Sequence, residues 1–242
     1  AIRNLVTFHP IDAALIDNQR IIVECGTIPD LVQLTKTGSQ QAQMLAAAGI
    51  SELASGAVFE RETQETRKVE ESKKSPPGKP QPEASSDDQS TDRLVLISEA
   101  GGITPLVTML STSNNLAREN ASGALMHLAL DSANAAAIAK ANGIGPLVTI
   151  LDDGTETAHK YAAETILRLG SGNEENQTQA AKHLVGLLAS ESVGTLCRTA
   201  RVLSKLAKQN PKSPVIIVNA GAIAPLVQLL STGALEVKFE VA

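Results

Sequence analysis

Three basic residues form the most chemically suggestive pattern in the sequence. Arg198, Arg201 and Lys205 are three and four residues apart, which places them on one stripe of a helix. Guanidinium groups make charge-assisted and often bidentate contacts with carboxylate and phosphate oxygens. The pattern therefore predicts a surface that binds an acidic or phosphorylated segment. The alternative is an ordinary solvated charged face, which most charged helix faces are.

No pattern in the sequence indicates catalysis or a bound metal. The four histidines and two cysteines are His9, His127, His159, His183, Cys25 and Cys197. They share no metal-ligand spacing and no nucleophile–base arrangement, and the sequence has no P-loop. We therefore expect no cofactor, no metal and no enzymatic activity. Cys25 aligns with Ala100, Ala141 and Ala220 in a stretch that recurs along the chain, so we expect it in the core. Two unpaired thiols fit a reducing compartment, and we expect the cytoplasm, with the nucleus as the alternative.

The composition favours an all-α chain without nucleic-acid binding. The 242 residues are 43% hydrophobic and 2% aromatic, so Leu, Ile, Val and Ala must form the core, and Ala and Leu are strong helix formers. No run of about 18 apolar residues is present, so we expect no membrane-spanning helix. Residues 60–92 hold nine acids and six bases, which leaves 17 acids against 15 bases elsewhere. That balance excludes the strong positive field that nucleic acids require.

A repeated stretch organises the chain. Residues 100–110 read AGGITPLVTML, residues 141–151 read ANGIGPLVTIL, and residues 220–230 read AGAIAPLVQLL, with weaker copies at 25–34 and 180–188. The first Leu of each Leu-Val pair falls at Leu31, Leu106, Leu147, Leu184 and Leu226. The gaps are 75, 41, 37 and 42 residues, close to the period of about 40 that is typical of helical solenoid repeats. The first gap exceeds the second by 34 residues, which indicates an insertion.

Each unit is predicted to contain three helices. In the third unit a first helix spans 134–141, a sharp glycine turn follows, a second helix begins at Pro146, and a third spans 156–169. The fourth unit has a shortened entry and lacks the Gly-Ile-x-Pro pattern. The predicted units are 18–55, 92–130, 134–170, 173–208 and a partial unit at 211–242, with residues 1–8 as the tail of a preceding unit. We expect the solenoid to continue beyond both ends.

The insertion spans residues 56–91. Its first half has a helix-forming composition that would extend the preceding third helix, whereas its second half is rich in Pro and Ser and is predicted to be a disordered linker. Three interpretations remain open: a passive linker, a regulatory tether, or a nuclear-localisation signal at Lys73-Lys74. If the insertion is a regulatory tether, phosphorylation of Ser75, Ser85 or Ser86 would dock it on the basic stripe.

The repeats resemble those of the armadillo family, in particular armadillo-only and vacuolar-type armadillo proteins. The resemblance rests on the Gly-Ile-x-Pro-Leu-Val motif repeated in phase, and it covers nearly the whole chain outside residues 56–91. It implies an all-α, right-handed solenoid of three-helix repeats whose third helices line a concave groove. In this family the groove usually binds an extended peptide or another protein.

The resemblance also indicates which third-helix residues face the groove. The family commonly places an Asn in each third helix, and here only Asn4 keeps it; the sequence has no Trp. This departs from the importin-α groove that binds basic peptides, and the basic stripe is more similar to the groove of β-catenin. The candidate groove residues are Asn4, Glu52, Asn120, His127, Tyr161, Glu164, Arg168, Arg198, Arg201 and Lys205.

The function expected from these patterns is that of a protein–protein interaction scaffold. We expect it to bind an extended segment, acidic or phosphorylated, along the third helices. The expected partner is another protein or peptide, not nucleic acid and not a membrane. The alternative is a substrate-recruiting or targeting segment of a larger multidomain protein such as a ubiquitin ligase.

Overall fold

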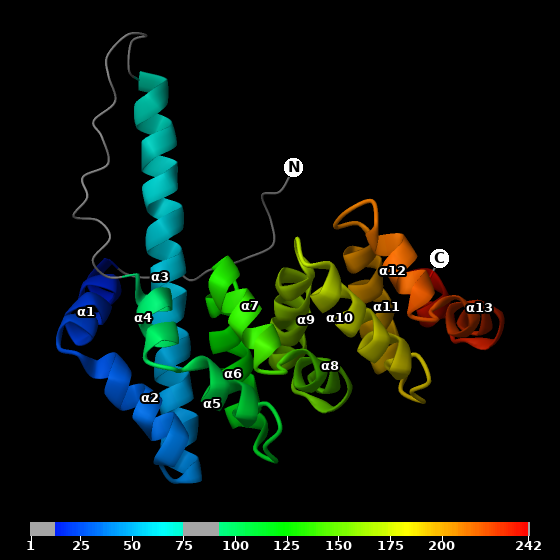
Figure 1. Cartoon of the computed structure of the whole chain (residues 1–242), viewed down its shortest axis with the longest axis horizontal. Helices are drawn as coiled ribbons and strands as arrows, with labels where there is room; N and C mark the ends of the chain where they lie inside the picture. Colours follow the sequence, from blue (N-terminus) through cyan, green and yellow to red (C-terminus); the bar gives the residue numbers. More distant parts are fainter. Residues whose placement is uncertain (1–12, 75–91, 242) are drawn as a thin grey trace.

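The structure is a computed structural model that describes residues 13–74 and 92–241. These residues form helices joined by short turns, with no strand among them. Successive helices follow one another along the long axis of the molecule (Figure 1), so the predicted all-α solenoid is confirmed. In chain order the helices are α1 (Ala13–Glu24), α2 (Thr27–Thr37), α3 (Gln40–Lys74), α4 (Arg93–Glu99), α5 (Ile103–Met109), α6 (Asn115–Leu128), α7 (Ser132–Lys140), α8 (Ile144–Asp153), α9 (Glu156–Gly170), α10 (Glu174–Leu187), α11 (Val193–Ala207), α12 (Ser213–Asn219), α13 (Ile223–Thr232) and α14 (Leu235–Val241).

A single left-handed residue makes the turn between the first and second helices of a unit. Gly26, Gly101 and Gly221 have φ values of 75°, 76° and 89°, and Asn142 holds the same place with φ 60°. Glycine adopts this conformation without steric cost, and Asn is among the side chains that tolerate it best. The sharp turn predicted at the motif is therefore confirmed, with Asn replacing Gly in the third unit.

The second helices begin two residues earlier than predicted. α8 starts at Ile144, not at Pro146, and α5 and α13 likewise start at the Ile of the motif. The Pro is thus the third residue of each helix. The first four N–H groups of a helix have no partner within it, so a Pro anywhere in the first turn removes no hydrogen bond.

The fourth unit has two helices where three were predicted. One continuous helix, α10, replaces the separate first and second helices, and α11 is the third. Gln179 stands five residues before Leu184, the place that the left-handed Gly101 and Gly221 hold before Leu106 and Leu226, and Ala180 and Ala181 after it are buried inside α10. Because Ala is the strongest helix former and no left-handed residue interrupts the chain, the helix continues through the position where other units bend.

The helix α3 extends well beyond its unit, as the composition of the insertion predicted. It continues to Lys74 and projects from the stack of units (Figure 1). Where it leaves the stack, Glu60 forms an ion pair with the buried Arg93 at 2.6 Å, and Arg93 Nη1 donates to Gln19 Oε1 at 3.0 Å. These contacts fix α3 to α1 and to the start of α4. The predicted disordered half of the insertion lies outside the described residues.

One continuous apolar core runs through the units. Ile50, Leu106, Leu125 and Leu147 are fully buried within it, and each comes from a position that the repeat phase assigns to the inside. Helix α6 packs on α3 and on α9. Adjacent units therefore share one core, which is how solenoids bury the apolar faces that a lone unit cannot.

One stretch of α3 satisfies the length and composition of a membrane span, which the sequence had led us not to expect. The stretch is Gln40–Arg61, rich in Ala, Gly and Leu. Ala46, Ala47 and Ile50 of the stretch are buried against neighbouring helices. A core helix with small apolar residues gives the same composition, so the stretch is explained by packing within the solenoid.

Candidate functional site

The third helices of the units form a continuous layer, here called the third-helix face. It consists of α3, α6, α9, α11 and α14, in which α6 packs on α3 and α9, and α11 packs on α9 and α14. The predicted groove residues that the structure describes all lie on these helices. Asn4 and the candidate phosphorylation sites Ser75, Ser85 and Ser86 lie outside the described residues, and they stay predictions.

Three of the predicted groove residues bind the units to one another. Each donates a hydrogen bond from its side chain to a main-chain carbonyl of the preceding unit. These bonds run from Asn120 Nδ2 to Met44 O (3.2 Å), from Arg168 Nη1 to Met126 O (2.6 Å), and from Arg198 Nε to Leu151 O (2.8 Å). A hydrogen bond contributes about 1.5–3 kcal/mol from the ionised Arg168 or Arg198 and about 0.5–1.5 kcal/mol from the neutral amide of Asn120, so these side chains are partly committed to the scaffold.

Gln209 makes a bond of the same kind that the sequence reasoning missed. Its Nε2 donates to the carbonyl of Leu167 at 2.6 Å, across to the preceding unit. Gln209 lies just after α11 and follows no repeated motif, so position in the repeat gave no signal for it. The contact becomes visible only when the two units are side by side.

His127 is a largely buried and neutral imidazole. Burial is the main cause, and the nearby Arg168 guanidinium the second, of a pKa lowered from 6.5 to about 4. Arg168 also forms an ion pair within its own helix, in which its Nε donates to Glu164 Oε1 at 3.0 Å. His127 therefore offers no positive charge at neutral pH, and Glu164 neutralises part of the charge of Arg168.

Residues from three units converge around Gly123. A Cβ atom on Gly123 would lie 2.9 Å from Ser51 Oγ and 3.1 Å from Tyr161 Cε2, so only Gly lets the ring approach α6 this closely. Burial raises the pKa of Tyr161, and the carboxylates of Glu119 and Glu52 raise it further. The predicted residues Tyr161 and Glu52 are thus brought near each other across α6.

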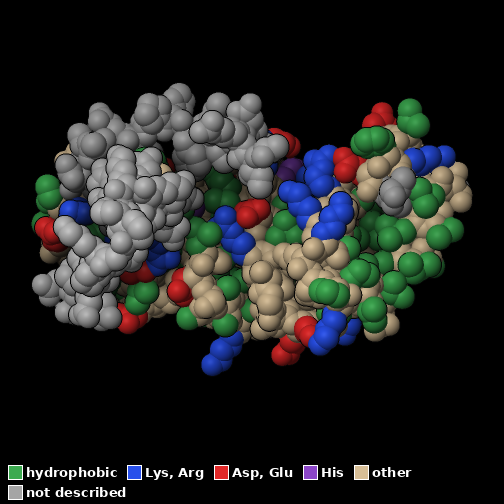
Figure 2. Space-filling view, turned by 90° about the horizontal axis from the view of Figure 1, so that it is seen from above, with side chains coloured by type: hydrophobic (Ala, Val, Ile, Leu, Met, Phe, Trp, Pro, Cys, Tyr) green, Lys and Arg blue, Asp and Glu red, His purple; other side chains and the backbone are tan. Residues whose placement is uncertain are grey.

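Arg201 and Lys205 are the most accessible members of the basic stripe. The side chain of Arg201 is 57% exposed, and Lys205 is exposed as well, whereas Arg198 is half-buried. Figure 2 shows Lys and Arg side chains gathered right of centre on this side of the molecule, with acidic groups beside them. Of the three predicted bases, two are therefore presented to solvent and one is held by the scaffold.

A carboxylate from the next unit already contacts the stripe. Glu240 on α14 forms an ion pair with Arg201, and a second contact joins Arg201 Nε to Glu240 Oε2 at 3.4 Å. The hydrogen bond from Arg201 lowers the pKa of Glu240. The sequence reasoning missed Glu240, although its spacing of 39 residues from Arg201 is one repeat and could have indicated the pair.

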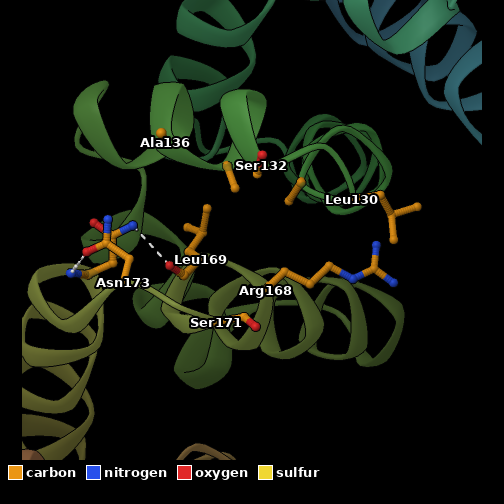
Figure 3. Close-up of a pocket in the computed structure, with 10 residues that line it drawn as sticks. Leu130, Ser132, Ala136, Arg168, Leu169, Ser171 and Asn173 are labelled. Carbon is orange, nitrogen blue, oxygen red and sulfur yellow. Dashed lines mark hydrogen bonds between the residues drawn. The ribbon is translucent and has the colours of Figure 1, made fainter. Parts of the chain in front are cut away.

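A small cavity lies where the second, third and fourth units meet. Its volume is about 270 Å³, and Arg168 lies along one side of it, near Leu130 (Figure 3). The residues around it are Ala129, Leu130, Ser132, Ala135, Ala136, Arg168, Leu169, Ser171, Asn173 and Asn176. Asn176 Nδ2 donates to Leu169 O at 2.9 Å, and Asn173 Oδ1 accepts from the N–H of Asn176. These polar groups serve the chain itself, so the cavity is a gap between units.

The cysteines and histidines form no metal centre in residues 13–74 and 92–241. No group of three His, Cys, Asp or Glu side chains in those ranges is arranged to hold a metal ion. Cys25 is exposed, so its predicted place in the core is wrong. It follows α1 at the open end of the first described unit, where Ile21 and Ile22 are exposed too.

Sequence comparison identifies one of the repeats. Residues 210–242 match the model of the Armadillo/beta-catenin-like repeat. No curated protein matches the chain. The matched stretch is the predicted partial unit of α12, α13 and α14, which carries the AGAIAPLVQLL copy of the motif.

Several solved structures share the fold. An engineered protein is similar with 21% identity and a TM-score of 0.61, over 93% of this chain and 82% of that one. A designed armadillo repeat protein in complex with the peptide (KR)4 is 22% identical, with a TM-score of 0.61, over 93% of this chain and 83% of that one. A computationally designed armadillo repeat protein for modular peptide recognition is 24% identical, with a TM-score of 0.56, over 88% of this chain and 79% of that one. The chain is therefore a solenoid with the armadillo-repeat fold, and its last unit matches the model of the Armadillo/beta-catenin-like repeat.

Proposed function

We propose that the chain is a protein-interaction scaffold that binds an extended acidic or phosphorylated segment along the third-helix face. Arg201 and Lys205 would contact the acidic groups of the ligand, and Arg198 would hold the helix in place. The observation that carries the proposal is the exposure of two bases one helical turn apart on α11. Binding alone, without a reaction, is the proposed activity.

The pairing of Arg201 with Glu240 supports the chemistry of this proposal. Glu240 places a carboxylate on the guanidinium from the neighbouring unit, where a ligand carboxylate or phosphate would make the same contact. Because both side chains are surface groups, their ion pair contributes at most about 1 kcal/mol and a ligand can displace it. Glu240 would thus act as an internal competitor.

The expected sign of the ligand charge is opposite to that in a similar structure. The designed armadillo repeat protein with 22% identity is in complex with a basic peptide, (KR)4. Here the accessible positions Arg201 and Lys205 on α11 are basic. We therefore propose that this chain uses the shared fold for ligands of negative charge.

The proposal is tested with a fluorescein-labelled peptide of alternating Glu and Ala and its Gln counterpart. Fluorescence anisotropy should show binding of the Glu peptide only. The double variant Arg201→Ala/Lys205→Ala should weaken it about two- to thirtyfold, since exposed charge contacts contribute about 0.2–1 kcal/mol each. The control Lys140→Ala/Lys182→Ala makes the same change in net charge at exposed sites on α7 and α10. Equal weakening by both double variants would reduce the effect to net charge and reject the site.

Replacing Glu240 tests the same proposal by an increase in peptide affinity, where the loss of the bases gives a decrease. Glu240→Gln should strengthen binding of the Glu peptide by up to about fivefold, because about 1 kcal/mol of competing ion pair is lost. The same variant combined with Arg201→Ala should show no gain. A gain that persists without Arg201 would mean that Glu240 acts through general repulsion and not at the proposed contact.

A further inference from the structure

The cavity beside Arg168 has a counterpart one repeat later, and there the chain fills the space with its own side chains. Gln177 Nε2 donates to Gln209 Oε1 at 3.1 Å, and Asn210 Nδ2 donates to Gln177 Oε1 at 3.5 Å. Gln209 Nε2 in turn donates to Leu167 O at 2.6 Å, and Gln177 is fully buried. Two glutamine side chains therefore occupy the place that corresponds to the cavity.

The cavity exists because small residues stand at the positions of those two glutamines. Ala135 and Gln177 each lie four residues after the N-cap of their helix. Gly172 and Gln209 each lie two residues after the end of a third helix. A Cβ atom on Gly172 would meet no other atom within 4 Å. Ala135 and Gly172 thus leave a space of about 270 Å³ that the chain does not fill itself.

Arg168 makes the hydrogen bond that Gln209 makes one repeat later. Its Nη1 donates to the carbonyl of Met126, which stands one repeat before Leu167, at 2.6 Å. Its Nε donates to Glu164 Oε1, which leaves Nη2 without a partner among the described residues. The carbonyl beside the cavity is therefore already bonded, and an occupant of the cavity needs no amide group to satisfy it.

The deeper lining of the cavity offers hydrocarbon contacts. Ala129 and Leu169 are buried there, and Ala135 is half-buried. The buried Asn176 beside them already donates to Leu169 O. Leu130 at the rim is 42% exposed and lies near the guanidinium of Arg168 (Figure 3). An apolar occupant would cover Leu130 and the alanines without separating a hydrogen-bonded pair.

The volume of the cavity limits the size of the occupant. A closed apolar cavity of about 150 Å³ holds a benzene molecule, whereas sites for drug-sized ligands measure about 300–1,000 Å³. The cavity, at about 270 Å³, lies between these values. It therefore suits one large side chain, such as Leu or Phe, better than a whole small-molecule ligand.

We propose that this cavity is a specificity pocket that takes one large apolar side chain of the acidic segment. The inference rests on the function proposed above, because the segment must run along the third-helix face. Arg168 and Lys205 hold the same repeat position on α9 and α11, which pack on each other, so a segment that contacts Lys205 passes the cavity one unit away. Neighbouring helices lie about 8–10 Å apart and an extended chain advances about 3.3–3.6 Å per residue. The apolar residue should therefore lie about three residues from the acidic one.

The test uses the fluorescein-labelled peptide of alternating Glu and Ala and two versions of it, in which the central Ala is replaced by Leu or by Gln. Because Glu recurs at every second residue, the peptide can shift along the third-helix face until its central residue reaches the cavity. In fluorescence anisotropy the Leu version should bind about three- to tenfold more tightly than the Ala peptide, since its additional hydrocarbon becomes partly buried. The Gln version should show no gain, because the Met126 carbonyl is already bonded.

Two variants of the chain that fill the cavity should remove the preference for Leu. Ala135→Gln introduces the residue that fills the counterpart, and Ala136→Leu extends a second lining residue. Both should bind the Leu and Ala peptides with equal affinity and leave the affinity for the Ala peptide unchanged. The matched control Ala133→Leu lies on the same helix, at an exposed residue outside the lining, and should keep the gain.

The outcomes separate the pocket from the proposed function. Equal affinity of the wild type for the Leu and Ala peptides overturns the pocket alone, if Arg201→Ala/Lys205→Ala still weakens binding of the Ala peptide. A preference for Leu that survives both Ala135→Gln and Ala136→Leu overturns it as well, because Leu would then bind elsewhere. A gain for Gln equal to that for Leu contradicts the apolar character of the pocket. If no peptide binds, the proposed function and the pocket are rejected together.

Discussion

His127 should make the folded chain sensitive to mild acid. Its pKa is about 4 in the folded state and 6.5 in its ordinary state, with burial as the main cause and Arg168 as the second. Between these values the unfolded chain binds a proton that the folded chain does not, so falling pH favours unfolding. The stabilisation from the neutral imidazole is complete above pH 6.5 and is lost as pH falls towards 4. At pH 5 the loss is about 2 kcal/mol relative to neutral pH.

Urea denaturation at pH 7 and pH 5 measures this loss. The wild type should lose about 2 kcal/mol more than His127→Asn, which lacks the titrating group. The variant His183→Asn, at an exposed histidine on α10, is the control and should lose as much as the wild type. If wild type and His127→Asn lost equal stability, the imidazole would not be buried as described.

The remaining predictions concern packing and the bonds between units. Gly143→Ala should destabilise the chain by about 1–3 kcal/mol in thermal or urea unfolding, because its Cβ would lie 2.8 Å from Ile138 Cγ2. Gly186→Ala, with no atom within 4 Å of the new methyl group, should instead stabilise α10 by about 0.5–1 kcal/mol; destabilisation there would refute the packing argument. Arg168→Met should cost about 1.5–3 kcal/mol through the lost bond to the α6 carbonyl. It should also raise the pKa of His127 in an NMR titration, though not to 6.5, because burial remains; an unchanged pKa would contradict the proximity of the two groups.

Repetition made most of the fold predictable. The phase of the Leu-Val pairs located the turns and showed that Ile50, Leu125 and Leu147 face the core, because a side chain that repeats with the unit repeats its surroundings. The extension of α3 followed from composition. The fourth unit was predicted incorrectly. The loss of its Gly-Ile-x-Pro motif was interpreted as a shorter first helix, whereas the first and second helices are fused into one. Gln179 in the place of the left-handed Gly or Asn, followed by Ala180 and Ala181, indicates a continuous helix, a signal that was present in the sequence.

The candidate site was less predictable because the same kinds of side chain can face a ligand or bind one unit to the next. Helical spacing placed Arg168, Arg198 and Arg201 on third helices, but spacing within one helix says nothing of which side chains reach a neighbouring carbonyl. That depends on how far one unit is rotated against the next. Glu240 shows the same limit, since opposite charges one repeat apart are informative only if the third helices pack side by side.

The continuous α10 has a mechanical consequence. Units one, two, three and five each contain a joint, the left-handed residue between their first two helices, whereas the fourth unit has an unbroken ladder of helix hydrogen bonds in the same place. A solenoid contacts only its neighbours, so its elastic response is the sum of local stiffnesses. Bending and stretching should therefore concentrate at the jointed units. The fourth unit, which carries the basic stripe on α11, should therefore bend less than the units around it.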